Sequence, residues 1–280
     1  MERTSIRLGG IALNSTIMNA SGPRSAERGE IFELSAVHAG ALVFKSCNIA
    51  GLDAPDNLKN RGAEHFASIA RDLVPRGKKI VGSVVGNTED EIVSVARILD
   101  KAGAAILELN LADDYVANSV APFASLDRLG SLLRRVRGEV GCVLAVKIPP
   151  RAALEPGAVA DCLKASGAAI AVCQNDLPRD LEVDIATGTA RGDSRALSQA
   201  HAMYLAARDG LDIVAVGGIN SGRDAYVAHL TGAKALQVGS ALIKEGAGAL
   251  GRIDRELEAL LAEHGKRSVA EIIGAIRFAK

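Results

Sequence analysis

Short apolar segments alternate with longer segments of helical periodicity along almost the whole chain. After two short strands, 6–8 and 11–13, joined at Gly9-Gly10 as in a two-residue hairpin, eight apolar segments predict buried strands. These strands cover residues 16–20, 41–45, 80–85, 104–110, 143–147, 168–173, 213–216 and 235–238. The helical segments cover residues 27–37, 63–74, 88–102, 126–136, 158–165, 196–207, 223–230, 247–263 and 269–278.

The alternation of short strands and helices predicts the fold class. Short buried strands separated by helices are typical of parallel sheets, and eight of them predict an α/β fold, a (β/α)8 TIM barrel with an N-terminal β-hairpin. The alternative is a doubly wound sheet, which would be expected to carry a GxGxxG turn after its first strand, and the sequence has none there. Residues 177–193 show no periodic apolar pattern and predict the longest loop. No shift in composition divides the chain, so we expect one domain spanning residues 1–280.

Composition and charge argue against several classes of function. Lys and Arg number 33, equal to the 33 Asp and Glu, and aromatic residues make up 3% of a chain without Trp, which disfavours nucleic-acid and membrane-surface binding. The four cysteines show no CxxC spacing, so neither a zinc site nor an iron–sulfur cluster is predicted. The sequence shows no signal-peptide pattern and no apolar run of about 20 residues, which favours a cytoplasmic protein acting on a small molecule.

Polar side chains gather at the C-terminal ends of the predicted strands. The stretch from Glu108 to Tyr115 is the most concentrated, because a buried strand ends there in Asn110 and is followed by Asp113 and Asp114. In a barrel the C-terminal strand ends converge on one face, where active sites are built. One such residue alone is more often a turn former or a solvated end, but the set predicts a site. Its members are Ser21, Lys45, Asn48, Asn110, Asp113, Lys147, Asn175, Gly217 and Gly218.

Two glycine-containing segments follow the last two predicted strands. Gly217-Gly218 follows the strand 213–216, and Gly239-Ser240 follows the strand 235–238. Glycine lets backbone N–H groups approach a phosphate closely, and the loops after strands seven and eight are the usual phosphate site of such barrels. These segments therefore predict a phosphate-bearing ligand, with ordinary turn glycines as the alternative.

Several motifs, taken as a set, resemble those of the class 1 dihydroorotate dehydrogenases. The resemblance covers nearly the whole chain and is closest over residues 217–278. It implies a barrel that binds FMN at its strand C-termini and moves a hydride between the flavin and a CH–CH bond of a dihydroorotate-like ring. The motifs are Asn19-Ala20-Ser21-Gly22, Lys45-Ser46, Asn48-Ile49-Ala50-Gly51-Leu52, Glu108-Leu109-Asn110-Leu111, Val146-Lys147-Ile148-Pro149-Pro150, Gly217-Gly218-Ile219 with Gly222-Arg223-Asp224-Ala225, and Gln237-Val238-Gly239-Ser240-Ala241-Leu242.

The resemblance also implies roles for individual residues. The two lysines would lie near the flavin ring, and the last two glycine segments would hold its phosphate. The implied cofactor-binding residues are Ala20, Ser21, Gly22, Lys45, Ser46, Asn110, Lys147, Gly217, Gly218, Gly239 and Ser240. Amide side chains match the donors and acceptors of a pyrimidine ring. The implied substrate-binding residues are Asn48, Gly51, Leu52, Asn110 and Asn175. A homodimer is expected by the same resemblance, while the electron acceptor is not indicated.

The chain departs from the family pattern at the general base. Where the family has Ser-Cys-Pro-Asn, this chain has Ala112-Asp113-Asp114-Tyr115. Asp113 therefore replaces the catalytic Cys, and we expect Asp113 and Lys45 to be catalytic, with like-charge repulsion from Asp114 strengthening the base. The alternative is that both carboxylates are solvated in an open loop. The segment between Lys45 and Asn48 is also shorter than in the family, so we expect that a lobe that covers the substrate is missing. The glycine-rich stretch after the sixth strand is reduced to residues 188–192.

These departures leave three alternatives to dihydroorotate oxidation. One is a diverged flavoprotein of the same family with a different substrate or a lost dehydrogenase activity. A second is a flavin-free sugar-phosphate lyase or isomerase, which would need a metal cluster or a Schiff-base lysine such as Lys147. A third is a non-catalytic subunit that keeps the fold. Bound flavin would separate the flavoproteins from the sugar-phosphate enzyme.

Overall fold

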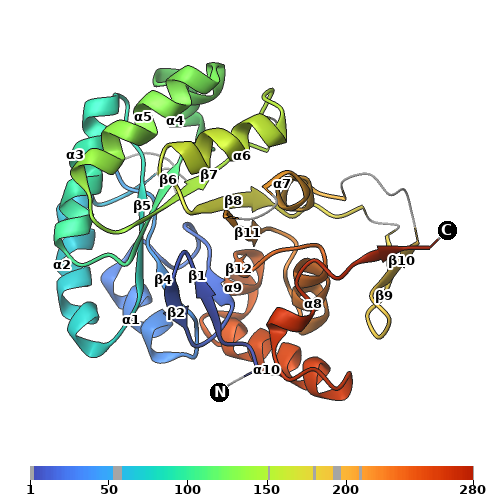
Figure 1. Cartoon of the computed structure of the whole chain (residues 1–280). Coiled ribbons are helices and arrows are strands. Elements are labelled where there is room, and N and C mark those ends of the chain that lie inside the picture. The colour runs from blue at the N-terminus through green and yellow to red at the C-terminus, as the bar shows by residue number, and fades with distance from the viewer. Residues whose placement is uncertain are drawn as a thin grey trace.

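Eight parallel strands form a nearly closed barrel in the computed structural model, which describes residues 3–52, 59–150, 152–178, 181–191, 197–207 and 210–279 (Figure 1). The strands pair in the order β3-β12-β11-β8-β7-β6-β5-β4, each parallel to its neighbour. Their bounds are β3 (Ile17–Asn19), β4 (Leu42–Val43), β5 (Ile80–Val84), β6 (Ile106–Asn110), β7 (Val143–Lys147), β8 (Ile170–Gln174), β11 (Asp212–Val216) and β12 (Ala235–Val238). The predicted (β/α)8 barrel is confirmed.

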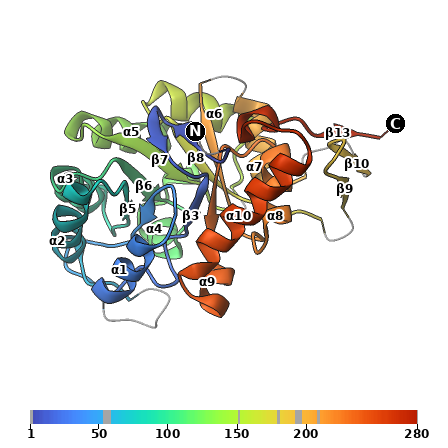
Figure 2. The same ribbon diagram turned by 90° about the horizontal axis from the view of Figure 1, so that it is seen from below.

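Helices surround this barrel in both views (Figures 1 and 2). The main ones are α1 (Arg28–Ala36), α2 (Ala63–Leu73), α3 (Glu89–Lys101), α5 (Leu126–Glu139), α6 (Pro156–Ala165), α7 (Gln199–Ala207), α8 (Gly222–Leu230) and α10 (Gly248–Glu263). Capping explains where α3 begins, because the Thr88 hydroxyl accepts the Glu91 N–H at 3.1 Å. Within the described ranges, none of the helices combines the length and the apolar character that a membrane crossing requires.

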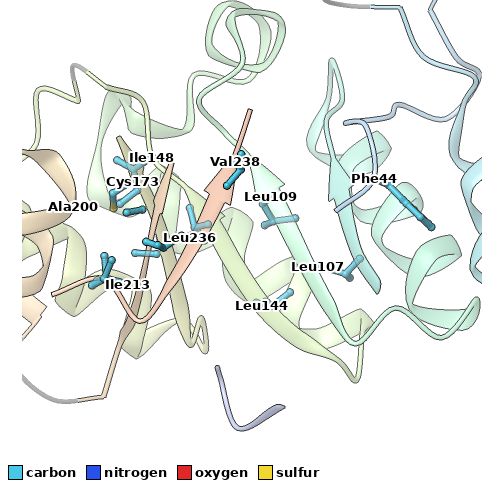
Figure 3. Close-up of a cluster of buried hydrophobic side chains, with 14 of the residues drawn as sticks. Phe44, Leu107, Leu109, Leu144, Ile148, Cys173, Ala200, Ile213, Leu236 and Val238 are labelled. Carbon is cyan, nitrogen blue, oxygen red and sulfur yellow. The ribbon is translucent and has the colours of Figure 1, made fainter. Parts of the chain in front are cut away.

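Two apolar layers flank the strands. Side chains that point outward from the strands pack against the helices, and Figure 3 labels members of this outer cluster from strands and helices alike, among them Leu107 and Leu109 of β6 and Ala200 of α7. Side chains that point inward form a separate cluster inside the barrel, to which Ile106 of β6 belongs. Successive side chains of a strand alternate between its two faces. Glu108, between Leu107 and Leu109, therefore faces the barrel interior.

The N-terminal hairpin closes one end of the barrel. Its strands are β1 (Ile6–Leu8) and β2 (Ile11–Leu13), paired as predicted. Leu8 and Leu13 belong to the inner apolar cluster. The N–H of Gly9 in the turn donates to Oδ2 of Asp212, the first residue of β11, at 2.7 Å. The hairpin therefore covers the N-terminal strand ends, and the C-terminal ends are left for a site.

One side chain joins the two strands at the ends of the pairing order. Asn19 of β3 donates from Nδ2 to the Val43 carbonyl of β4 at 2.5 Å and accepts the Val43 N–H on Oδ1 at 3.0 Å. The amide of Asn19 thus supplies the donor and acceptor that a neighbouring backbone would supply in a regular sheet. Both residues are buried, so these two bonds close the barrel.

Some predicted elements were wrong. The segment 177–193, expected to be a loop, contains β9 (Glu182–Asp184) and β10 (Thr189–Arg191), and the expected last helix is instead a 3-10 turn, η3 (Val269–Glu271), followed by β13 (Arg277–Phe278). β13 pairs with β10, far away in sequence, and local periodicity carries no signal of such pairing (Figure 2). The short elements α4 (Asp114–Ser119), α9 (Ser240–Glu245), η1 (Val74–Arg76) and η2 (Pro122–Ala124) were not predicted either.

Candidate active site

A layer of mostly polar side chains lies in the barrel interior above the inner apolar cluster. Each of its members follows an inward-facing apolar residue by two positions, and residues two apart on a strand share a face. On β6, for example, Glu108 follows Ile106, and on β12 Gln237 follows Ala235. The layer lies toward the mouth of the barrel, by which we mean the C-terminal strand ends and the loops after them. Its polar members are Lys45, Ser83, Glu108, Lys147, Gln174 and Gln237.

Glu108 is the centre of this layer. Its carboxylate is fully buried and accepts Gln237 Nε2 on Oε2 at 2.5 Å, while Oε1 lies 3.5 Å from Ser21 Oγ and 3.7 Å from Lys147 Nζ. Lys147 Nζ also donates to Ser21 Oγ at 3.4 Å. β6 and β12 are four places apart in the pairing order, as are β7 and β3, so these side chains meet near the barrel axis from opposite walls.

The sequence interpretation placed Ser21 and Lys147 at the mouth but assigned no role to Glu108 or Gln237. A glutamate and a glutamine inside short apolar strands were the available signal, because carboxylates and amides are rarely buried without partners. The partnership itself was not visible, since Glu108 and Gln237 are 129 positions apart in the chain.

A second hydrogen-bonded group lies beside the first and joins three strand ends. Asn110 Nδ2 donates to Ser46 Oγ at 2.9 Å, and Ser46 Oγ lies 2.9 Å from Ser83 Oγ. All three side chains are buried. The structure thus brings together Ser46 and Asn110, both predicted to bind the cofactor.

Lys45 and Asp113, the two predicted catalytic residues, act on one another electrostatically. Burial lowers the pKa of Lys45, the nearby Lys147 cation lowers it further, and the negative charge of Asp113 opposes both effects. Asp113 is half-buried, and its N–H lies 3.4 Å from the Asn110 carbonyl in the turn after β6. Whether Asp113 acts as a base therefore stays a prediction, while the side chains of Asp114 and Tyr115 lie outside the described part of the structure.

Four buried amide oxygens at the mouth have no hydrogen-bond partner among the residues that the structure describes. They are Asn48 Oδ1, Asn110 Oδ1, Asn175 Oδ1 and Gln237 Oε1, and each residue is at most 8% exposed. The orientation of two of these amides is determined by their neighbours. Gln237 Nε2 donates to the Glu108 carboxylate and Asn175 Nδ2 donates to the Gly217 carbonyl at 3.5 Å, so both oxygens point elsewhere. Buried acceptors without partners are costly, and a bound ligand with N–H donors would satisfy them.

The two glycine segments lie side by side at the mouth. β11 and β12 are paired, and beyond them Ser240 Oγ donates to Asn220 Oδ1 at 3.0 Å. Gly217 and Gly218 both have positive φ, 101° and 72°, which a residue with a side chain adopts only with strain. The Ala20 N–H donates to the Val238 carbonyl at 2.8 Å, which places the predicted cofactor segment 20–22 against Gly239.

A cavity of about 540 Å³ opens beside Gly218, between the loop after β8 and helix α8. Asn175 and Asp176 line it on one side, and Arg223 and Asp224 line it on the other. Arg223 Nη2 donates to the Val183 carbonyl at 2.8 Å. The sequence predicted Asn175 and Gly218 as site residues but not Asp176. The Asp176 side chain lies close to Gly217, because its Oδ1 would be 3.7 Å from a Cβ atom added to that glycine.

The predicted substrate residues after β4 lie on a short loop. Asn48 is buried at the strand end, and the next residue, Ile49, donates its N–H to Glu91 Oε1 at 3.2 Å. Leu52 exchanges two backbone hydrogen bonds with Asn60, at 2.9 and 3.1 Å, so the loop closes on itself beyond Gly51. Contact of Gly51 and Leu52 with a substrate stays a prediction, and residues 53–58 lie outside the described part.

Comparison with known proteins places this site in a family. The family model for dihydroorotate dehydrogenase matches residues 56–261. A curated protein of Streptococcus equi subsp. equi, named "Putative dihydroorotate dehydrogenase A (fumarate)", is 25% identical over 311 aligned positions that cover 99% of both chains. A protein of the same name from Streptococcus agalactiae serotype Ia is 23% identical, with 97% of each chain covered.

Solved structures show the same fold. DHODH from Eimeria tenella in complex with ferulenol superimposes with a TM-score of 0.77 at 18% identity, covering 98% of this chain and 88% of that one. The ligand-free form of DHODH from Eimeria tenella gives a TM-score of 0.78, with 98% and 92% covered. The polar mouth described above therefore belongs to a chain that is a member of the dihydroorotate dehydrogenase family.

Proposed function

We propose that this protein is an FMN-dependent oxidoreductase that transfers a hydride between the flavin and a CH–CH bond of a small, amide-bearing ring of the dihydroorotate type. The observation that carries this proposal is the set of four unpartnered amide oxygens at the mouth, three of them on predicted substrate residues. Family membership supports the reaction class, and the names of the relatives support the ring.

The residues at the mouth fit FMN. The backbone of Gly217 and Gly218, with Gly239 and Ser240 beside it, would hold the phosphate. The segment 20–22, together with Ser46, Asn110 and Lys147, would contact the flavin, with Lys45 as a second cation near the ring. When bound, FMN supplies the carrier for the hydride.

Asp113 would move the proton that accompanies the hydride. The carboxylate takes a proton from one ring carbon as the hydride leaves the neighbouring carbon, so that the C–C single bond becomes a double bond. The charges of Asp113 and Lys147 both act on Lys45, which would be the second cation near the ring. The flavin-free alternative with Lys147 as a Schiff-base lysine gains no such support, because Ser21 and Glu108 engage Lys147 Nζ.

An anaerobic visible spectrum of the purified protein, reconstituted with FMN, tests this function. We expect flavin absorbance that bleaches on adding a reduced ring substrate. The Asp113→Asn variant should keep the flavin and lose roughly 100-fold or more in the rate of bleaching. The matched Asp161→Asn variant, at an exposed position of α6, should bleach at the wild-type rate. A protein that takes up no FMN would overturn the proposal, and an unchanged rate in Asp113→Asn would remove Asp113 as the base.

A further inference from the structure

We propose that the ring oxidised at this site carries N–H donors and no carboxylate, so that an uncharged cyclic ureide or lactam is preferred to dihydroorotate itself. This inference rests on the proposed function and specifies its substrate class. Two independent features of the mouth support it, the hydrogen-bonding character of its unpartnered groups and the balance of its charges.

The unpartnered amide groups at the mouth, among the described side chains, all present an acceptor. Asn48, Asn110, Asn175 and Gln237 each direct a buried side-chain oxygen that no described group satisfies. Their amide nitrogens are in part already used, by the Ser46 hydroxyl, the Gly217 carbonyl and the Glu108 carboxylate. A ligand that satisfies these oxygens must bring N–H or O–H groups. The ring N–H groups of a pyrimidine can supply these donors, whereas a carboxylate adds acceptors only and satisfies none of the oxygens.

The two lysines described at the mouth already interact with carboxylates. Lys147 Nζ lies 3.7 Å from Glu108 Oε1, and the charge of Asp113 acts on Lys45. Asp176 adds a third carboxylate beside Gly217. In the neighbouring cavity, Arg223 donates to the Val183 carbonyl, and Asp224 lines the same wall. Within the described ranges, the carboxylates at the mouth therefore outnumber its lysines.

This balance disfavours an anionic ring. Two carboxylates that share a site repel one another, and the repulsion is stronger in a partly buried site than in water. A substrate carboxylate would meet Asp113, which stands where the ring must be deprotonated. A neutral ring with N–H groups meets no such repulsion and matches the unpartnered oxygens.

Uracil and orotate form a matched pair of probes, because they differ only by the carboxylate. Titrating each into the FMN-reconstituted protein by calorimetry should give at least tenfold tighter binding of uracil. In Asp113→Asn the ratio of the two affinities should move at least tenfold toward orotate, because one repelling charge is removed. Asp176→Asn should move it in the same direction by a smaller factor, and Asp161→Asn should leave it unchanged.

The results that would contradict this inference differ from those that would contradict the proposed function. Orotate binding as tightly as uracil, or binding of neither ring, would overturn the inference, as would an affinity ratio that stays constant in both Asp113→Asn and Asp176→Asn. Flavin absorbance is read on the same samples and tests the proposed function separately. A protein that binds no FMN would overturn the proposed function. Calorimetry does not require flavin, so the affinities of uracil and orotate can still be compared on that protein and decide the inference about the substrate.

Discussion

Glu108 is a buried carboxylate in the polar layer of the barrel, and its charge would act on a flavin bound at the mouth. It pairs with Lys147 and accepts hydrogen bonds from Gln237 and Ser21, so it both neutralises and orients the lysine expected at the flavin. A negative charge beside a flavin disfavours the reduced, anionic form, and a cation favours it. The net effect of Lys147 on the flavin therefore depends on Glu108.

Replacing Glu108 with Gln should raise the midpoint potential of the bound flavin. The variant keeps the size of the side chain and removes the charge that offsets Lys147, and we expect a rise of roughly 30 mV, the two-electron equivalent of about 1.4 kcal/mol. Spectroscopic titration against a reference dye measures the potential. Glu64→Gln on the exposed side of α2 is the matched control and should leave it unchanged. An unaltered potential in Glu108→Gln would show that the ion pair has no influence on the flavin.

At the scale of elements, the closure between β3 and β4 depends on the Asn19 side chain. Asn19→Ala would leave the buried N–H and carbonyl of Val43 without partners. We expect a loss of roughly 2–4 kcal/mol in the free energy of unfolding, measured by urea denaturation. Asn14→Ala, at an exposed position nearby, should cost less than about 0.5 kcal/mol. Equal stability of the two variants would mean that backbone contacts alone close the barrel.

The C-terminal segment is held in place by Tyr204 of α7, which packs closely against Gly232 and Gly274. A Cβ on Gly274 would stand 1.8 Å from Tyr204 Oη, whereas a Cβ on Gly265 meets nothing within 4 Å. Both glycines have similar positive φ, 71° and 67°, so the strain of a side chain is matched between them.

Gly274→Ala should therefore destabilise the protein more than Gly265→Ala. The difference isolates the steric clash, and we expect roughly 1–3 kcal/mol in urea denaturation. Gly274→Ala should also expose β13 to early proteolysis, because β13, which pairs with β10, begins shortly after this contact. Equal stabilities would indicate that Tyr204 moves aside at little cost.

At the scale of the whole molecule, buried histidine makes folding sensitive to acid. His229 is fully buried, donates from Nδ1 to the Ala233 carbonyl at 2.7 Å, and its Nε2 lies 3.0 Å from Thr16 Oγ1. Burial lowers its pKa to about 4. In the unfolded chain the pKa is about 6.5. Between these values the unfolded state binds the additional proton, so stability falls as the pH is lowered through this window.

Urea denaturation between pH 7 and pH 4 should therefore show a stability loss of up to about 3 kcal/mol from this group. Burial also lowers the pKa of His201, which adds a loss of the same sign. His229→Gln, which keeps a hydrogen-bonding side chain, should give a flatter pH dependence than the wild type. Parallel curves for the two proteins would refute the assignment to His229.

Most of the barrel could be predicted from sequence, since local patterns determine its parts. β7 and β12 coincide with the predicted strands 143–147 and 235–238, because each is a short, mostly apolar run followed by a turn signal, Pro149-Pro150 after β7 and Gly239 after β12. The pairing of β13 with β10 could not be predicted, because it depends on distant residues. The same holds within the site. Residues at strand ends such as Asn110 were found from their position, but the Glu108–Gln237 bond across the barrel leaves no local signal.

The alternation of inward and outward side chains has a consequence for how this chain can change in evolution. Inserting one residue into β6 would move Glu108 into the outer apolar layer and Leu109 into the interior, which would destroy the polar layer and the packing at once. A change of length in the loop after β4 alters only the segment that lies at the mouth and leaves the strands of the barrel in register. New substrates are therefore reached through loop length and single substitutions, while the length of each barrel strand stays constant.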